Sequence, residues 1–290
     1  MSDDPFVTHR SLLFTVAYEM LGSAADAEDV VQEAWLRWAD TDRAAVRDPR
    51  AYVVRIVTRK ALDRLRALAR QREEYIGEWL PEPLLTSPDV AEDVELAESV
   101  SIAMLTVLET LGPTERAVFV LHEVFVVPYD EIAAAVGKTP TAVRQIAHRA
   151  REHVANRRPR MRVNQAEQRA VLERFMAALT TGDMQGLLDV LAPDVVVVAD
   201  GGGVVPAARK PVEGREKVAR LLPAFAAFAP GAQITTVGLN GALAARIDLN
   251  GRVAAVSLTV EDGRITRIYL IANPHKLARL GEEVRLSRAY

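Results

Sequence analysis

The stretch from Pro113 to Val154 constrains the fold of this chain most, because it predicts two short helices joined by a tight turn. Residues 129–136 carry apolar side chains at helical spacing, and Gly137 follows where the chain must turn sharply. Thr139 is a good N-cap, and Pro140 occupies the first helical position, where its missing N–H costs nothing. The stretch therefore predicts a helix-turn-helix with a supporting helix in front of it.

The second helix of this motif has two chemically different faces. Its apolar positions, which we expect to be buried, are Val143, Ile146, Ala147 and Ala150. Its polar and basic positions are Thr141, Arg144, Gln145, His148, Arg149 and Arg151. Arg and Gln side chains pair bidentately with base edges in the DNA major groove, and Arg also reaches phosphate. This face predicts DNA binding, and the alternative is a basic amphipathic helix packed in a bundle.

The composition excludes several classes of protein. The 290 residues are enough for two or three domains, and no apolar run approaches the roughly 20 residues that cross a bilayer. The acidic N-terminal sequence MSDDPFVTHR does not look like a secretion signal. The absence of cysteine excludes disulfides, thiol redox sensing and cysteine-rich zinc sites. We therefore expect a cytoplasmic protein that has no metal site, no cofactor and no membrane partner.

An acidic helix is predicted near the N-terminus. Residues 9–39 read as two helices around a break at residues 21–23, and Ser23 can cap the second helix. One face of that helix carries Asp26, Asp29, Gln32 and Glu33. Such a face is either simply solvated or docks on a basic partner.

A basic helix is predicted over about residues 50–72. Its basic residues include Arg55, Arg59, Lys60 and Arg64, which give a second electrostatic footprint for nucleic acid. With Trp35, Trp38 and Tyr52 nearby in sequence, the helix would also suit unstacked single-stranded bases, although core packing is the other interpretation of these aromatics.

The rest of the chain divides into a linker, a helical segment and a mixed domain. Residues 73–95 are acidic and proline-rich, which predicts an extended linker with an apolar patch that docks on something, and one helix is expected over 92–111. From about residue 164, helices precede a strand at 195–200, and the pairs Asn240-Gly241, Asn250-Gly251 and Asp262-Gly263 signal hairpins. This order predicts an α+β domain with a concave sheet face.

The N-terminal features together resemble a bacterial extracytoplasmic-function (ECF) sigma factor. DAEDVVQEAWLR resembles the family's polymerase-binding helix, and DPRAYVVRIVTRKALDRLR resembles the helix that reads the promoter −10 element. PTERAVFVLHEVFVVPYDEIAAAVGKTPTAVRQIAHRAR resembles the domain that reads the −35 element. The resemblance implies two partners, core RNA polymerase and promoter DNA.

The remainder resembles the SnoaL-like, ketosteroid-isomerase-like cone, and the fusion is similar to the sigma-J type of ECF sigma factor. The hallmarks are WLPEPL at 79–84, DGGG at 200–203 and NPHKL at 273–277. This resemblance implies regulation in cis, without a separate anti-sigma protein. The expected domains are 1–72 (sigma-2), 73–95 (linker), 96–158 (sigma-4 helix-turn-helix) and 164–290 (SnoaL-like).

The resemblance assigns a role to each group of residues. Polymerase binding falls to Asp26, Asp29, Gln32 and Glu33, −10 binding to Arg55, Arg59, Lys60 and Arg64, and −35 binding to Thr141, Arg144, Gln145, His148 and Arg149. A regulatory interface is expected at Trp79, Leu80, Pro81, Pro83, Leu84, Asp200, Gly201, Gly202, Gly203, Asn273, Pro274, Lys276 and Leu277.

Two other classes of function stay open at this point. One is a ligand-responsive helix-turn-helix regulator, because the cone could hold an unidentified small ligand. The other is a SnoaL-type enzyme with a DNA-binding module, for which Asp200, Tyr269 and His275 are the candidate polar groups. Their spacing shows no acid–base constellation, so we expect no enzyme activity.

Overall fold

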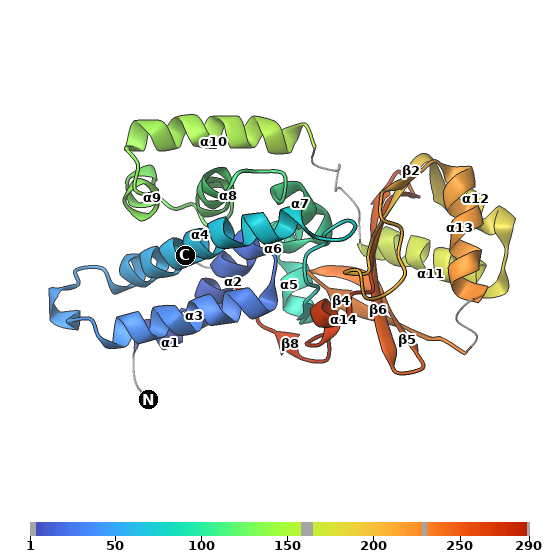
Figure 1. Cartoon of the computed structure of the whole chain (residues 1–290), viewed down its shortest axis with the longest axis horizontal. Helices are drawn as coiled ribbons and strands as arrows, with labels where there is room; N and C mark the ends of the chain where they lie inside the picture. The colour runs from blue at the N-terminus through green and yellow to red at the C-terminus, as the bar shows by residue number, and fades with distance from the viewer. Residues whose placement is uncertain (1–3, 158–164, 228–230, 289–290) are drawn as a thin grey trace.

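The computed structural model describes residues 4–157, 165–227 and 231–288. Helices from the first half of the chain pack together at one end of the molecule, and a sheet covered by further helices forms the other end (Figure 1). The predicted fold class, two all-α domains followed by an α+β domain, is confirmed.

The first helical domain consists of α1 (Pro5–Thr8), α2 (Arg10–Leu21), α3 (Ala24–Ala39), a 3-10 turn at Arg43–Ala45 and α4 (Pro49–Glu73). Gly22 ends α2 with a φ of 66°, and the Ser23 hydroxyl accepts a hydrogen bond from the Asp26 amide to start α3. Trp38 is 1% exposed and Tyr52 packs partly buried against the core, whereas Trp35 is 36% exposed, so the core interpretation holds for Trp38 and Tyr52 but not for Trp35.

The second helical domain differs from the prediction in its lead segment. One helix was expected over 92–111, but the chain forms α5 (Pro88–Glu92), α6 (Val94–Val100) and α7 (Ile102–Leu108). The breaks have a local cause: Asp93 accepts from the Leu96 amide and Ser101 from the Met104 amide, so each side chain caps a new helix. The domain continues with α8 (Pro113–Phe119), a π-helical turn η2 (Val120–Val124), α9 (Tyr129–Val136) and α10 (Pro140–Ala155).

The C-terminal domain begins with α11 (Gln165–Thr181) and α12 (Met184–Val190). It continues with β2 (Leu191–Asp200), β3 (Val212–Glu213), α13 (Arg215–Ala227), β4 (Gln233–Leu239), β5 (Ala242–Leu249), β6 (Arg252–Glu261), β7 (Arg264–Ile271), α14 (Pro274–Leu277) and β8 (Glu283–Val284). The three predicted hairpins are confirmed, because the Asn or Asp and the Gly of each turn both have positive φ, as type I′ turns require.

Both faces of the sheet are covered. Alternate residues of the strands, such as Leu258 and Ile268, pack with α11, α12 and α13 in one apolar cluster. Their neighbours, such as Tyr269 and Ile271, pack in a second cluster that also contains Leu80 of the linker and Ile102 of α7. The face expected to be a concave ligand site is therefore not open: protein covers the sheet on each side.

The linker contributes a strand to this sheet. β1 (Leu85–Thr86) lies between β4 and β8 in the order β3-β2-β7-β6-β5-β4-β1-β8. After β8, Leu286 enters the core of the helical part, and the Ser287 amide donates to Thr15 Oγ1 of α2. The C-terminal domain is thereby joined to the helical domains at both the linker and the tail.

The two helical domains share one continuous apolar core. α8 and α9 lie between α10 and α4, so that α10 runs along the outside of the molecule (Figure 1). This packing fixes which of the two basic helices faces solvent and which faces another domain.

Candidate nucleic-acid interface and the linker junction

The exposed face of α10 is the first candidate surface. Gly137 ends α9 at a φ of 69°, and Thr139 Oγ1 accepts from the Ala142 amide at 3.3 Å to start α10. The residues predicted to be buried, Val143, Ile146, Ala147 and Ala150, are buried. Thr141, Arg144, Gln145, His148 and Arg149 are all exposed on the opposite side. The helical period and the Thr139 cap together therefore determine which side chains of α10 face solvent.

The charged side chains on the exposed face of α10 make only long, weak contacts with neighbouring acids. Arg149 Nε lies 4.0 Å from Glu115, and His148 Nε2 lies 3.8 Å from Glu152. Exposed pairs at such distances contribute little free energy. The α10 side chains can therefore turn toward a ligand at small cost.

The basic face of α4 is the second candidate surface, and the second helical domain partly covers it. Arg59 donates from Nη2 to the Ala134 carbonyl at 2.7 Å and from Nε to the Ala135 carbonyl at 3.3 Å. These carbonyls belong to the last turn of α9, where the helix dipole places partial negative charge. Arg55 lies over the ring of Tyr52, 5.0 Å from its centroid.

The remaining cations of α4 pair with the acidic face of α3. Lys60 Nζ lies 2.7 Å from Glu33, and Arg64 Nη2 lies 2.5 Å from Asp26 and 3.9 Å from Asp29. The hydrogen bond that Arg64 donates to Asp26, followed by the negative charge of Asp26, raises the pKa of Arg64. The two surfaces that sequence reasoning treated as separate thus neutralise each other, and Gln32 stays exposed.

The three hallmark motifs meet in one buried junction around Asp200. Its carboxylate, which is 1% exposed as a residue, accepts from Tyr75 Oη (2.6 Å), the Leu80 amide (2.9 Å), the Gly202 amide (3.0 Å) and Lys276 Nζ (2.7 Å). Burial lowers the pKa of Lys276 to about 8, against the opposing attraction of Asp200. This network joins the linker, the DGGG loop and the NPHKL turn.

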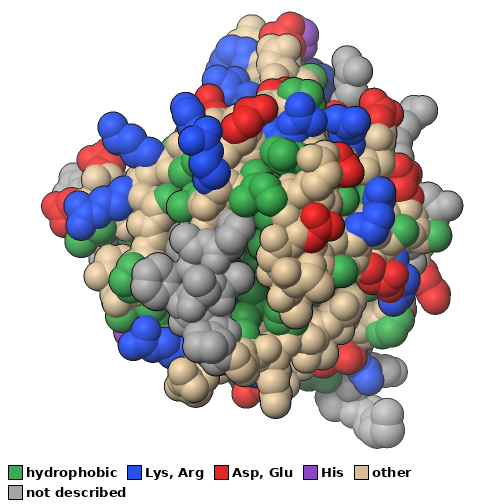
Figure 2. All heavy atoms as spheres, turned by 90° about the vertical axis from the view of Figure 1, so that its right-hand side faces the viewer, with side chains coloured by type: hydrophobic (Ala, Val, Ile, Leu, Met, Phe, Trp, Pro, Cys, Tyr) green, Lys and Arg blue, Asp and Glu red, His purple; other side chains and the backbone are tan. Residues whose placement is uncertain are grey.

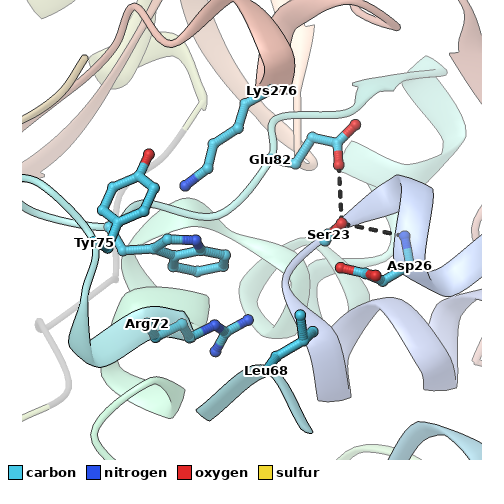
Figure 3. Close-up of a pocket in the computed structure, with 8 residues that line it drawn as sticks. Ser23, Asp26, Leu68, Arg72, Tyr75, Glu82 and Lys276 are labelled. Carbon is cyan, nitrogen blue, oxygen red and sulfur yellow. Dashed lines mark hydrogen bonds between the residues drawn. The ribbon is translucent and has the colours of Figure 1, made fainter. Parts of the chain in front are cut away.

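Trp79 lies between cations from two domains. The Arg72 guanidinium of α4 is 4.0 Å from the ring and Lys276 Nζ is 3.9 Å from it, both at cation–π distance. Lys276 and Arg72 reach the junction from opposite sides in Figure 3. A pocket of about 200 Å³ opens here, lined by Ser23, Asp26, Leu68, Arg72, Tyr75, Trp79, Glu82 and Lys276.

Close packing fixes the other motif residues. A Cβ on Gly202 (φ +61°) would lie 2.3 Å from Asn273 Nδ2, and one on Gly203 would lie 3.1 Å from Ile76. Gly201, Asn273 and Leu277 are buried, as are the linker residues Leu80, Pro81, Pro83 and Leu84, whereas Pro274 is exposed. The structure therefore brings the predicted interface residues together, apart from the outward-facing Pro274.

Sequence reasoning missed three residues of this junction: Tyr75, Glu82 and Asn240. Glu82 accepts from the Ala24 amide (2.8 Å), the Ala25 amide (3.3 Å) and Ser23 Oγ (3.2 Å), so the linker caps α3. Burial raises the pKa of Glu82. No sequence signal marked Glu82, because only the fold shows that the flanking Pro81 and Pro83 are buried and that its carboxylate therefore needs donors.

Asn240 links three segments through its side chain. It accepts from the Leu84 amide (2.8 Å) and donates to Tyr18 Oη (2.6 Å) and to the Val100 carbonyl (2.8 Å). Its place in an Asn-Gly hairpin concealed this second role, because the turn alone explains the residue type.

The polar groups considered for catalysis do not converge. The Asp200 carboxylate already accepts hydrogen bonds in the junction, Tyr269 lies in the cluster covered by the linker and α7, and His275 is exposed. Burial raises the pKa of Tyr269. Within the described residues, no three His, Asp or Glu side chains are grouped to hold a metal ion, and no helix is long and apolar enough to cross a membrane.

The outer surface of the C-terminal domain differs from both basic helices. Figure 2 views that end of the molecule and shows basic and acidic side chains interspersed on the visible face. Charges of both signs are therefore mixed on this face, whereas the candidate faces of α4 and α10 are mainly basic.

Comparison with known proteins accounts for all three domains. The profile of Sigma-70 region 2 matches residues 6–71, that of Sigma-70 region 4 matches residues 101–154, and that of the SnoaL-like domain matches residues 172–268. The ECF RNA polymerase sigma factor SigJ of Mycobacterium tuberculosis is 38% identical, over 95% of this chain and 93% of its own length. The probable ECF RNA polymerase sigma factor SigI of the same species is 34% identical, over 95% and 94%.

A solved structure extends this similarity to three dimensions. The crystal structure of M. tuberculosis SigJ superposes with a TM-score of 0.74 at 36% identity, covering 94% of this chain and 97% of that one.

Proposed function

Because this chain belongs to the ECF RNA polymerase sigma factors that carry a SnoaL-like C-terminal domain, we propose that it directs core polymerase to promoters through α10 and α4 and that its C-terminal domain regulates it in cis. It works where polymerase and chromosome are, in the cytoplasm. The observation that carries the proposal is the pair of basic helical faces, one in each matched sigma region.

The −35 element is read by the exposed face of α10. Thr141, Arg144, Gln145, His148 and Arg149 contact its major groove, with the Arg and Gln side chains on base edges. Support comes from the exposure of all five and from the buried opposite face, which leaves a single orientation for docking.

The −10 strand is held by Arg55, Arg59, Lys60 and Arg64 of α4. In the structure, Arg59 is bonded to the end of α9, and Lys60 and Arg64 are paired with α3. Binding of the strand therefore replaces these contacts with phosphates, and the acids of α3 become free at the same time.

Polymerase binds the acidic face of α3, at Asp26, Asp29, Gln32 and Glu33. Charged faces steer encounter and fix register with a complementary partner. Asp29→Lys with Glu33→Lys should weaken binding to core polymerase, and Asp194→Lys, an exposed acid on the C-terminal domain, is the matched control.

The C-terminal domain sets the spacing of the two DNA-reading domains. The −35 and −10 elements are about 25 base pairs apart, or about 85 Å of B-DNA. α4 contacts α9 directly, so one promoter cannot engage both helices in this arrangement. The junction at WLPEPL, DGGG and NPHKL holds the closed form, which makes a separate anti-sigma protein unnecessary.

The C-terminal domain acts here by packing rather than by catalysis. The junction pocket of about 200 Å³ is smaller than the roughly 300–1,000 Å³ of most ligand sites. A small ligand that widened it would reach α3, α4, the linker and the C-terminal domain together.

In vitro transcription with purified core polymerase tests the function. A sigma factor restores initiation at specific promoters, and removal of residues 164–290 changes that activity. A ligand-responsive helix-turn-helix regulator would bind duplex promoter but leave core polymerase silent, and an enzyme with a DNA-binding module would do the same while turning over a substrate.

A further inference from the structure

The turn that leads into the helix-turn-helix has an unusual backbone. The π-helical turn η2 at Val120–Val124 is followed by Val126, whose φ is 53°. A β-branched residue is strained in this left-handed region, and Val126 is 70% exposed, so burial of its own side chain does not offset the strain. Such irregularities persist where surrounding contacts impose them, and they cluster at functional positions.

The contacts around Val126 show what the turn positions. Phe125 and Val127 on either side are buried, and the Val127 amide donates to the Leu121 carbonyl at 2.9 Å. The Val127 carbonyl lies 3.2 Å from His122 Nδ1, and since a carbonyl only accepts, the imidazole donates from Nδ1. The turn thereby fixes the plane of the His122 ring.

The His122 ring supports Tyr129, which in turn contacts the recognition helix. The two rings stack with their centroids 4.1 Å apart and their planes 29° apart. The Arg144 guanidinium lies 5.7 Å from the centroid of the Tyr129 ring, within cation–π distance. A line of contacts therefore runs from the strained turn through two rings to a side chain of the α10 face.

We propose that Tyr129, held by His122, is a positioning residue that orients Arg144 for one base of the −35 element. The inference rests on the proposed function, which assigns Arg144 to base reading. A free arginine side chain loses rotamer entropy when it is fixed, and an aromatic support removes part of that cost in advance. The base that matches the Arg144 guanidinium is guanine, whose O6 and N7 accept its two parallel hydrogen bonds.

A double-mutant cycle tests the proposal with the full chain bound to core polymerase. Binding is measured on duplexes that carry each of the four bases at each −35 position. Arg144→Ala identifies the base that Arg144 reads, through a fall in discrimination of about 5- to 150-fold at that position. Tyr129→Leu should lower discrimination about 3- to 10-fold at the same position and not elsewhere.

Matched variants separate positioning from a structural role, since Tyr129 also packs against the helical core. Tyr129→Phe keeps the ring and should restore discrimination. Tyr129→Leu should add nothing in the Arg144→Ala background, whereas it should add fully to Gln145→Ala, which alters a different base. If Tyr129→Leu does not fold, His122→Leu replaces it, with His122→Phe as its ring-keeping control.

Two outcomes would overturn the inference in distinguishable ways. Equal loss of affinity for all sequences with Tyr129→Leu, or full additivity with Arg144→Ala, would show that Tyr129 only supports the fold. An Arg144→Ala variant with unchanged base discrimination would overturn the assignment of Arg144 itself, and with it this part of the proposed function.

Discussion

The exposed face of α10 and the basic face of α4 resemble each other in sequence but differ in the structure. His148, Arg149 and Arg151 of α10 lie 3.6–4.0 Å from neighbouring acids, while Arg59, Lys60 and Arg64 of α4 have partners at 2.5–2.7 Å. Arg59 is moreover bonded to backbone carbonyls of the other helical domain. Two basic helices can therefore differ in how available their side chains are to a ligand, and the difference is decided by what packs against each helix.

This difference suggests an order of events on the promoter. Under the proposed function, the α10 face would meet duplex DNA without rearrangement, whereas α4 would have to leave α9 before it held a strand. The following changes test that contrast, from the largest expected effect to the smallest.

Asp200→Ala should have the largest effect, because it leaves the partly buried Lys276 ammonium without its counter-charge and the Tyr75 hydroxyl without its acceptor. Breaking such a buried pair costs about 3–5 kcal/mol. Chemical denaturation should show this loss of unfolding free energy, and proteolysis in the linker should become faster. Asp194→Ala, at an exposed position, should change neither. Unchanged stability of the Asp200 variant would mean that the junction does not hold the closed form.

Glu19 should make the closed form sensitive to pH. It lies on α2, wholly buried against the second helical domain, where burial raises its pKa to about 8 despite the Ser99 hydrogen bond and the charge of Arg116. Because the carboxyl has a higher pKa folded than unfolded, its contribution to stability is complete below about pH 4.5 and disappears as the pH rises through 8.

The measurement is the free energy of unfolding between pH 5 and 9. The wild-type chain should lose up to about 1.4 kcal/mol per pH unit over the interval below pH 8. Glu19→Gln, which keeps an acceptor for Ser99, should remove that slope. Parallel curves for the two chains would contradict the assignment.

Arg59→Ala should loosen α4 from α9 without unfolding either domain. Two hydrogen bonds from an exposed guanidinium contribute about 0.5–1 kcal/mol together, so the ratio of open to closed chains should rise roughly twofold to fivefold. The chain has no cysteine, so labels at Asp63→Cys and Lys138→Cys report the separation by energy transfer. Arg55→Ala, whose guanidinium contacts Tyr52 of the same helix, is the control. Equal transfer in both variants would show that Arg59 does not hold the domains together.

Lys60→Ala should have the smallest effect on the fold. Its pair with Glu33 is solvent-exposed, so the unfolding free energy should change by less than about 1 kcal/mol. The salt dependence of single-stranded −10 DNA binding should nevertheless lose about 0.7 in slope, the value of one phosphate contact. Lys217→Ala on α13 should leave the slope unchanged, and an unchanged slope for Lys60→Ala would remove this residue from the −10 surface.

The sequence predicted those features of the fold that depend on residues close together in the chain. The two faces of α10 follow from helical period and from the Thr139 cap, and the three hairpins follow from Asn-Gly and Asp-Gly pairs. Over residues 92–111 the apolar period predicted one helix, and this was wrong because Asp93 and Ser101 offered competing caps. An apolar period and a capping side chain are local signals of similar strength, and here the caps prevailed.

The contacts that determine availability could not be predicted, because they join residues distant in sequence. Glu82 caps a helix 58 residues earlier, and Asn240 donates to Tyr18, 222 residues away. Arg59 is bonded to backbone carbonyls, and these carry no residue-type signal at all. The sequence shows that residue 59 is an arginine, but only the fold shows that its guanidinium is already hydrogen-bonded to α9.

The place of β1 between β4 and β8 has a consequence for synthesis of the protein. The linker strand leaves the ribosome early, but its two neighbours, β4 (Gln233–Leu239) and β8 (Glu283–Val284), are made much later. A nascent chain therefore contains the complete helices of both sigma domains before the strands that flank β1 in the sheet have been made. If the C-terminal domain restrains the sigma domains as proposed, a newly made chain passes through an unrestrained stage until β4 and β8 have been made.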